Sequence, residues 1–143
     1  GSSVEGVKLA AEIMNQIDTK SEGEIMDVIE KASPDLAVRI QEKMFVFSDL
    51  MAVDDRSMQF IVKELSGDIL GLALKGSDEQ IRDKFLKNMS ERAAEMMIED
   101  MDAKGPVKLS DVEKSQQEII KIARRLEQEG KLVRAGRGGD VLV

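Results

Sequence analysis

Apolar side chains recur at spacings of three and four residues along most of the chain, a periodicity typical of amphipathic helices. No segment resembles a strand convincingly. The aromatic content points the same way, because strands favour aromatic side chains and the chain has four Phe but no Trp or Tyr. We therefore expect an all-α protein.

Helix start and stop signals divide the chain into about seven or eight expected helices. Pro34 fits a first helical position after a Ser33 N-cap, and Gly76 is expected to be a left-handed cap after a helix that begins at Ser66. Three further Ser residues precede Glu or Gln by three positions, as in a capping box: Ser21, Ser77 and Ser110. The remaining signals are Asp54-Asp55 as an acidic N-cap, Gly105-Pro106 as the end of a helix over residues 90–103, and Gly130 as the end of a long last helix.

Composition excludes several classes of function. The formal charge of −7 disfavours binding along nucleic-acid phosphates. The chain has no Cys and no His, so zinc, thiolate and imidazole chemistry are not indicated, and no cofactor is expected. No apolar run approaches the ~20 residues of a membrane span, and no secretory signal is present. The Gly1-Ser2 start without an initiator Met is typical of a fragment of a longer protein.

Enzymatic activity is not expected either. Carboxylates are abundant, but acid–base catalysis needs burial or a charged partner to shift their pKa, and their helix-surface spacing indicates solvated groups. The pair Asp54-Asp55 is better explained as a helix cap than as a metal site, because no further oxygen ligands converge on it in the sequence.

The block Met44-Phe45-Val46-Phe47 interrupts the helical periodicity and holds two of the four Phe. It is either a buried connector or a hinge whose side chains enter two neighbouring cores. Periodicity alone does not separate these alternatives.

The helix expected over residues 90–103 divides into two faces. Ala93, Ala94, Met97, Ile98 and Met101 form an apolar face. The other face, here called the charged arc, comprises Glu91, Arg92, Glu95, Met96, Glu99, Asp100 and Asp102. A solvated helix surface would produce the same pattern, and Lys75 at the end of its helix would equally suit a capping cation. The exposed Met96 among charges is the unusual residue.

Six blocks stand out when they are taken together: Met44-Phe45-Val46-Phe47, Asp54-Asp55-Arg56-Ser57, Leu72-Ala73-Leu74-Lys75-Gly76, the run from Asn88 to Met96, Gly105-Pro106-Val107-Lys108 and Ala123-Arg124-Arg125-Leu126. In their order and spacing they resemble the FliG family of flagellar motor switch proteins, and the resemblance extends from about Val4 to Val133. The resemblance implies an all-α fold of armadillo-like, right-handed superhelical bundles, with two subdomains joined by a hinge. The domains it implies are an armadillo-like subdomain over residues 1–43, a hinge and linker over 44–53, a torque-generating domain over 54–133 and a flexible tail over 134–143.

The same resemblance implies a non-enzymatic rotor component that transmits torque and takes part in switching the direction of rotation. Its partners are the cytoplasmic loop of the stator subunit MotA or PomA, FliM, and neighbouring FliG subunits, at the cytoplasmic face of the inner membrane. The family motif that binds FliM, of Glu-His-Pro-Gln type, is absent from this chain. The positions that match the stator-contact charges are Lys75, Arg92, Glu99, Asp100 and Lys108; Met44, Phe45, Val46 and Phe47 match the hinge. A generic helical scaffold or a regulatory domain of a transporter is the alternative.

Overall fold

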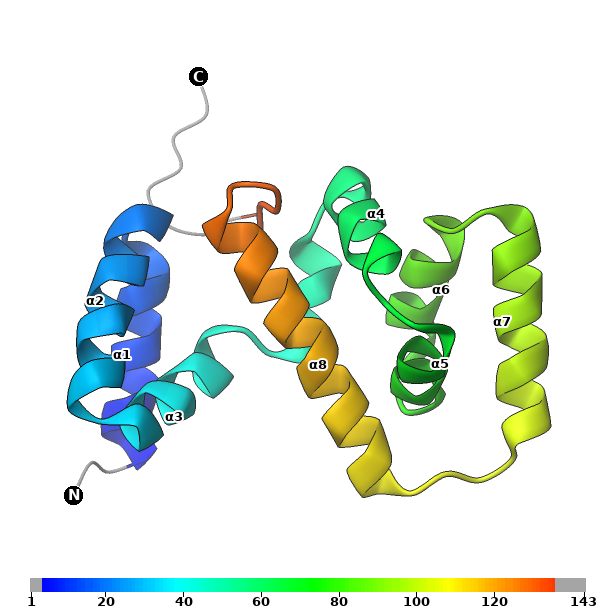
Figure 1. The fold of residues 1–143 in the computed structure, drawn as a ribbon, viewed down its shortest axis with the longest axis horizontal. Coiled ribbons are helices and arrows are strands. Elements are labelled where there is room, and N and C mark those ends of the chain that lie inside the picture. Colours follow the sequence, from blue (N-terminus) through cyan, green and yellow to red (C-terminus); the bar gives the residue numbers. More distant parts are fainter. Residues whose placement is uncertain (1–3, 136–143) are drawn as a thin grey trace. The chain divides into compact units, whose positions relative to one another are not determined.

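A computed structural model describes residues 4–135. Its elements are α1 (Val4–Gln16), α2 (Thr19–Ala32), α3 (Pro34–Met44), the short 3-10 helix η1 (Phe47–Ala52), α4 (Asp55–Lys63), α5 (Gly67–Lys75), α6 (Glu79–Lys87), α7 (Glu91–Lys104) and α8 (Leu109–Gln128) (Figure 1). The described residues therefore form an all-α, armadillo-like fold, as the sequence predicts. No helix among them is both long enough and apolar enough to cross a bilayer.

The chain folds into two compact units. Unit 1 contains the described residues up to Val46 together with Arg134 and Ala135, and unit 2 contains Phe47–Val133. The polypeptide consequently passes between the units twice, at residues 46–47 and 133–134. Residues 47–53, expected as linker, instead begin unit 2, and Leu50 and Val53 are buried there.

Unit 1 is built on three helices, with α3 packed against both α1 and α2. Its core consists of residues at helical spacing: Val7, Ala11, Met14, Met26, Ala37, Ile40 and Met44. The Ser33-Pro34 start of α3 is confirmed, since the Ser33 hydroxyl accepts the Leu36 N–H. Apolar residues at three- and four-residue spacing thus produce the expected packing.

In unit 2 the long helix α8 packs on α5 and α4, and α5 also contacts α7 (Figure 1). Ile119, Ala123 and Leu126 of α8 are buried, as are Leu70 and Leu74 of α5. Helix α8 ends in a Schellman motif, in which Lys131 N–H donates to Leu126 O and Gly130, at φ 78°, donates to Glu127 O. The expected end of α8 near Gly130 is therefore confirmed.

The three predicted capping boxes are wrong. The N-cap of α2 is Asp18, whose carboxylate accepts both the N–H and the hydroxyl of Ser21. Similarly, Asp78 caps α6 by accepting the Ile81 N–H, while the Ser77 hydroxyl donates to Leu74 O of the preceding helix. Helix α8 begins after Lys108 without a side-chain cap. In the first two cases an aspartate, which caps as well as serine, lies close to the predicted residue.

Gly76 also differs from expectation, because its φ is −99° and it is not left-handed. A Cβ at this position would overlap Val112 Cγ1 of α8. The glycine is required by the close approach of α5 and α8, not by backbone conformation.

Candidate partner-contact surface

Helix α7 carries most of the candidate contact residues, and local sequence fixes both of its ends. The Ser90 hydroxyl accepts the Ala93 N–H at 3.1 Å, and Gly105 follows the helix at φ 67°. Both signals confirm the predicted bounds to within a residue. Met97 and Met101 are buried, and a Cβ added to Gly71 of α5 would lie 3.6 Å from Met97 Sδ. Small and flexible side chains therefore hold α7 against α5.

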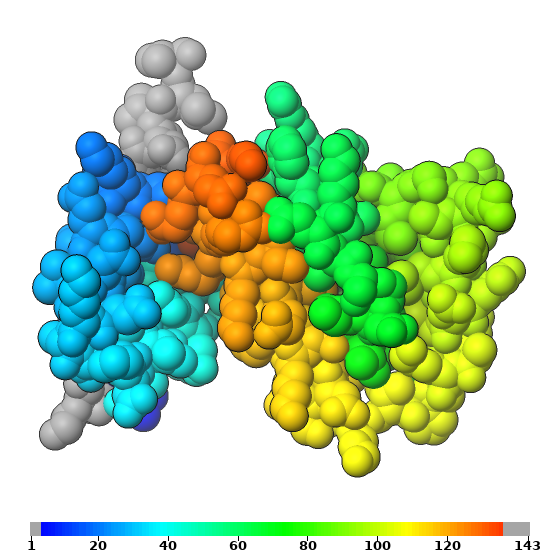
Figure 2. All heavy atoms as spheres, in the orientation of Figure 1, coloured from blue at the N-terminus to red at the C-terminus, as the bar shows by residue number. Residues whose placement is uncertain are grey.

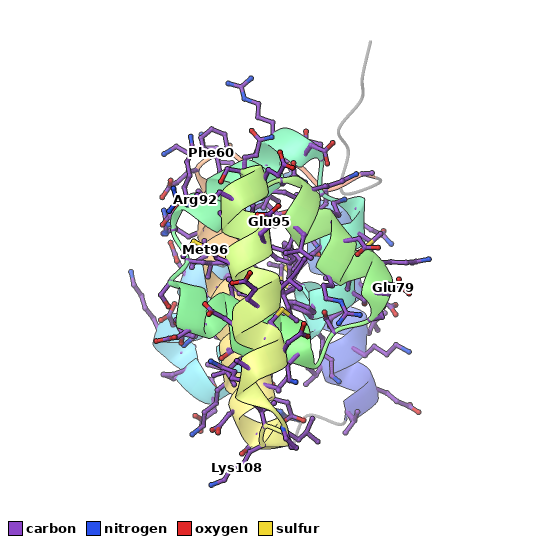
Figure 3. All side chains as sticks on the ribbon, turned by 90° about the vertical axis from the view of Figure 1, so that its right-hand side faces the viewer. Phe60, Glu79, Arg92, Glu95, Met96 and Lys108 are labelled. Atoms are coloured by element: carbon purple, nitrogen blue, oxygen red, sulfur yellow. The ribbon has the colours of Figure 1, made fainter. Side chains whose placement is uncertain are left out.

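The opposite face of α7 is open to solvent. Arg92, Glu99 and Asp100 are exposed, and in Figure 2 the yellow-green side chains of α7 form the outer edge of unit 2. In Figure 3 Arg92 and Met96 project to one side of the helix, and Glu95 lies toward the other side, nearer α6. Met96 is 55% exposed, which confirms its predicted place in the charged arc.

Ile98 corrects the predicted apolar face, because 45% of it is exposed. Helix α7 lies at the edge of unit 2, and only Met97 and Met101 at the centre of its inner face are fully enclosed. The residues that flank this centre, including Ile98, remain accessible.

The charges at the five candidate positions have no ion-pair partner among the residues that the structure describes. Helix α8 differs, since Lys121 pairs with Glu118 at 3.3 Å and Arg125 pairs with both Glu64 and Glu129. On α7 itself, no ion pair joins Arg92 to Glu95 or to Glu99. These side chains can therefore meet a partner without first breaking an internal contact.

The two lysines lie apart from the α7 charges. Lys75 is half-buried at the end of α5, next to Gly76, and Lys108 is exposed one turn before Val112 of α8. The contact between Gly76 and Val112 places both lysines at the junction of α5 and α8. Figure 3 shows Lys108 beyond the lower end of α7 and Arg92 near the upper end, so the five residues form two groups.

The Met44–Phe47 block spans the boundary between the units. Met44 and Phe45 are completely buried. Within unit 2, the Phe47 ring stacks on Phe85 with centroids 6.3 Å apart. Val46, between the two Phe, is 40% exposed.

Arg134 is the residue of this region that sequence reasoning missed. It was expected to begin a flexible tail, but it is buried, and its guanidinium lies 4.2 Å from the Phe45 ring centroid. It donates to Met44 O at 2.9 Å and to Asn15 Oδ1 at 3.3 Å. Asn15 Nδ2 also donates to Met44 O, so two side chains cap the end of α3. No local pattern distinguishes Arg134 from a tail residue; residues 136–143 of the predicted tail lie outside the described part of the chain.

The acidic pair at 54–55 lies at the start of helix α4. Asp54 Oδ1 accepts the Ser57 N–H at 2.7 Å, while Asp55 lies 3.7 Å from Lys87 Nζ. Hydrogen bonds from Ser57, through its side chain first and its backbone second, lower the pKa of Asp54. Residues 4–135 contain no group of three or more acidic side chains placed to hold a metal ion. Asp54 is therefore the N-cap of α4, and Asp55 is the acidic residue of its first turn.

Comparisons with known proteins agree with the resemblance. Residues 27–133 match the FliG C-terminal domain. The flagellar motor switch protein FliG of Pseudomonas aeruginosa is 51% identical over 138 residues, covering 96% of this chain and 41% of the relative. FliG of Thermotoga maritima is 46% identical over 142 residues, covering 99% of this chain and 42% of the relative. The structure of full-length FliG from Aquifex aeolicus superposes with a TM-score of 0.81 at 43% identity, covering 88% of this chain and 39% of that one.

These matches define the class of protein: the relatives are flagellar motor switch proteins, a family of structural proteins and not of enzymes. The chain belongs to the FliG family and carries its C-terminal domain. It spans about two fifths of the length of the curated relatives it matches.

Proposed function

We propose that this chain transmits torque in the flagellar motor through contacts between α7 and the cytoplasmic loop of the stator subunit, MotA or PomA. Arg92, Glu99 and Asp100 provide the main contact, with Lys75 and Lys108 as a second group. The observation that carries this proposal is that all five charged groups lack an internal ion-pair partner within residues 4–135.

The weakness of such contacts suits a motor. An exposed ion pair contributes about 0–1 kcal/mol, so each contact with the stator forms and breaks quickly. Several of them acting in turn along α7 pull the rotor without trapping it. A buried pair would cost several kcal/mol to separate and would hold the rotor in place.

Charge reversal tests the contact. The double substitution Arg92→Glu and Asp100→Lys keeps the net charge and should abolish swimming while the domain remains folded. Its matched control is Glu118→Lys with Lys121→Glu, which reverses an exposed pair on α8 and keeps that pair's attraction. The proposal fails if cells with the α7 reversal swim normally, or if both reversals impair swimming equally.

A second part of the proposal concerns switching of the rotation sense. Met44, Phe45, Val46 and Phe47 act as a hinge: Phe45 is anchored beneath Arg134 in unit 1, and Phe47 is anchored on Phe85 in unit 2. Because both Phe side chains are anchored, rotation of one unit against the other can take place only at the backbone of the exposed Val46 and at residues 133–134, where the chain passes between the units a second time. Because the chain has no native Cys, pairs of introduced cysteines can carry spin labels that report the distance between units. The same distance distribution in clockwise- and counterclockwise-biased variants would count against the hinge.

The remaining partners belong to the assembled rotor. Leu9, Ile13, Ile25 and Val28 expose apolar side chains on α1 and α2, which supports contact with a neighbouring FliG subunit. FliM, the other partner, would bind the whole protein mainly through the family motif that this chain lacks. The rotor in this proposal lies in the C ring at the cytoplasmic face of the inner membrane, where it takes part in chemotaxis.

A further inference from the structure

The flank of α7 opposite Met96 borders a groove. This groove lies between α6 and α7, has a volume of about 270 Å³, and is lined by Leu86, Ile98 and Met101 together with Glu79, Arg82 and Asp83. Figure 3 shows Glu79 of α6 on the side of α7 away from Met96. This volume lies just below the range of about 300–1,000 Å³ that is usual for small-molecule sites, and it gives room for one inserted side chain.

The floor of the groove is apolar. Ile98 is 45% exposed, Leu86 is half-buried, and the buried Met101 closes the base. An aliphatic side chain entering here would remove both its own surface and that of Ile98 from water. The flexible thioether of Met101 can adjust to the shape of the incoming group.

Acidic residues border this floor on both helices. Glu79 and Asp83 are four residues apart on α6, and Glu91, Glu95 and Asp102 share the helical flank of Ile98 on α7, at spacings of seven, three and four residues from it. All five carboxylates are exposed, and Arg82 is the one cation lining the groove. None of these six charged groups has an ion-pair partner within the described residues. The groove therefore complements a cationic partner.

We propose that the α6–α7 groove receives an aliphatic side chain, of the size of Leu, from a cationic helix of the partner. The partner's Lys or Arg residues lie on both sides of that side chain and face the two acidic rows, as in other complexes where an amphipathic helix occupies a groove between helices. The inference rests on the proposal that α7 is the partner-contact helix. It adds an apolar anchor, Ile98, to a contact otherwise made of exposed charges.

Model helices test the groove directly. The probe is a stapled, Lys-rich helical peptide with one central Leu, and its matched form carries Gln in place of that Leu. Binding to the 143-residue chain is measured by fluorescence anisotropy at low ionic strength. We expect Ile98→Gln to weaken the Leu peptide about tenfold, because the burial of an aliphatic side chain is lost. The same substitution should leave the affinity of the Gln peptide unchanged.

Two variants of the chain serve as controls. Ile98→Val keeps most of the apolar contact and should bind the Leu peptide nearly as well as the original chain. Met96→Gln removes an exposed apolar side chain from the opposite flank of α7 and should leave the affinity unchanged. Equal affinities of the original chain for the Leu and Gln peptides would overturn the inference, as would an equal loss from Met96→Gln and Ile98→Gln.

The outcome can be separated from that of the proposed function. If Ile98→Gln alters neither peptide binding nor swimming while reversal of Arg92 and Asp100 stops swimming, the groove inference fails and the stator contact stands. If the reversal leaves swimming normal while the peptide results are as expected, the stator contact fails and the groove stands as a binding site.

Discussion

Replacing Gly76 with Ala tests whether space, not backbone conformation, requires the glycine. At φ −99° the backbone accepts any L-residue, so the substitution adds no strain in the main chain. The added methyl group would overlap Val112 Cγ1 and lie 3.3 Å from Val112 Cβ. Val112 is buried and β-branched, and a β-branched residue in a helix has essentially one favourable χ1 rotamer, so it cannot rotate away.

The expected loss follows from two opposing effects. Overpacking typically costs about 1–3 kcal/mol, whereas replacing Gly by Ala restricts the unfolded chain and returns about 0.4–1 kcal/mol. We therefore expect Gly76→Ala to lower the free energy of unfolding of unit 2 by about 1–2 kcal/mol. Urea unfolding followed by circular dichroism measures the loss, and hydrogen exchange of the α5 and α8 amides locates it.

A control and a rescue make the test specific. Gly67, at the start of α5, has no atom within 4 Å of an added Cβ, so Gly67→Ala should be neutral or stabilising by up to about 1 kcal/mol. Val112→Ala removes the obstructing methyl groups, and its combination with Gly76→Ala should show a favourable coupling of about 1 kcal/mol. Strictly additive effects, or a Gly76→Ala chain as stable as the original, would refute the spatial explanation.

Two further predictions concern Arg134 and Asp54. Arg134→Ala should destabilise unit 1 by about 1.5–3 kcal/mol, because a charged donor to Met44 O and the contact with the Phe45 ring are lost. Urea unfolding measures the loss, with Arg39→Ala, at an exposed arginine of α3, as the control. Equal stabilities of the two variants would contradict the prediction. The pKa of Asp54 is lower in the folded chain than its ordinary value of 3.8, so its cap stabilises α4 above that pH and this contribution disappears as the pH falls through the folded pKa. In Asp54→Asn, whose neutral amide also caps, the loss of stability between neutral and acidic pH should be smaller, and an unchanged acid dependence of urea unfolding would rule this out.

Local sequence predicted the helices well and their first residues less well. The apolar periodicity of a helix reflects its buried face over several turns. A shift of one residue in the helix boundary therefore does not alter the pattern. An N-cap, in contrast, is a single residue, and other residues that can cap a helix often lie within a few positions of it. Asp18 lies three residues before the predicted cap Ser21, and Asp78 directly follows the predicted cap Ser77, so only the hydrogen bonds reveal which residue caps each helix.

Contacts between distant residues could not be derived from local pattern. Arg134 caps α3 across 90 residues of sequence, and Gly76 meets Val112 across the α5–α8 interface. The exposure of Ile98 likewise depends on α7 lying at the edge of unit 2, whereas a helical wheel assumes that one whole face is covered. The candidate charges were identified by resemblance, and their lack of internal partners became visible only with the side chains in place.

The charge pattern of α7 itself favours a partner. Glu91, Glu95 and Glu99 follow one another at four-residue spacing, and like charges at this spacing destabilise a helix by about 0.2–0.5 kcal/mol per pair. Glu91 in the first turn is favourable for the helix dipole, but Asp102 in the last turn is not. A cationic partner would relieve this repulsion as it binds, and would gain affinity without any single strong ion pair. Because the inward contacts of α7 depend on Met97 and Met101, substitutions of the acidic residues in its charged arc should change this affinity without unfolding the helix.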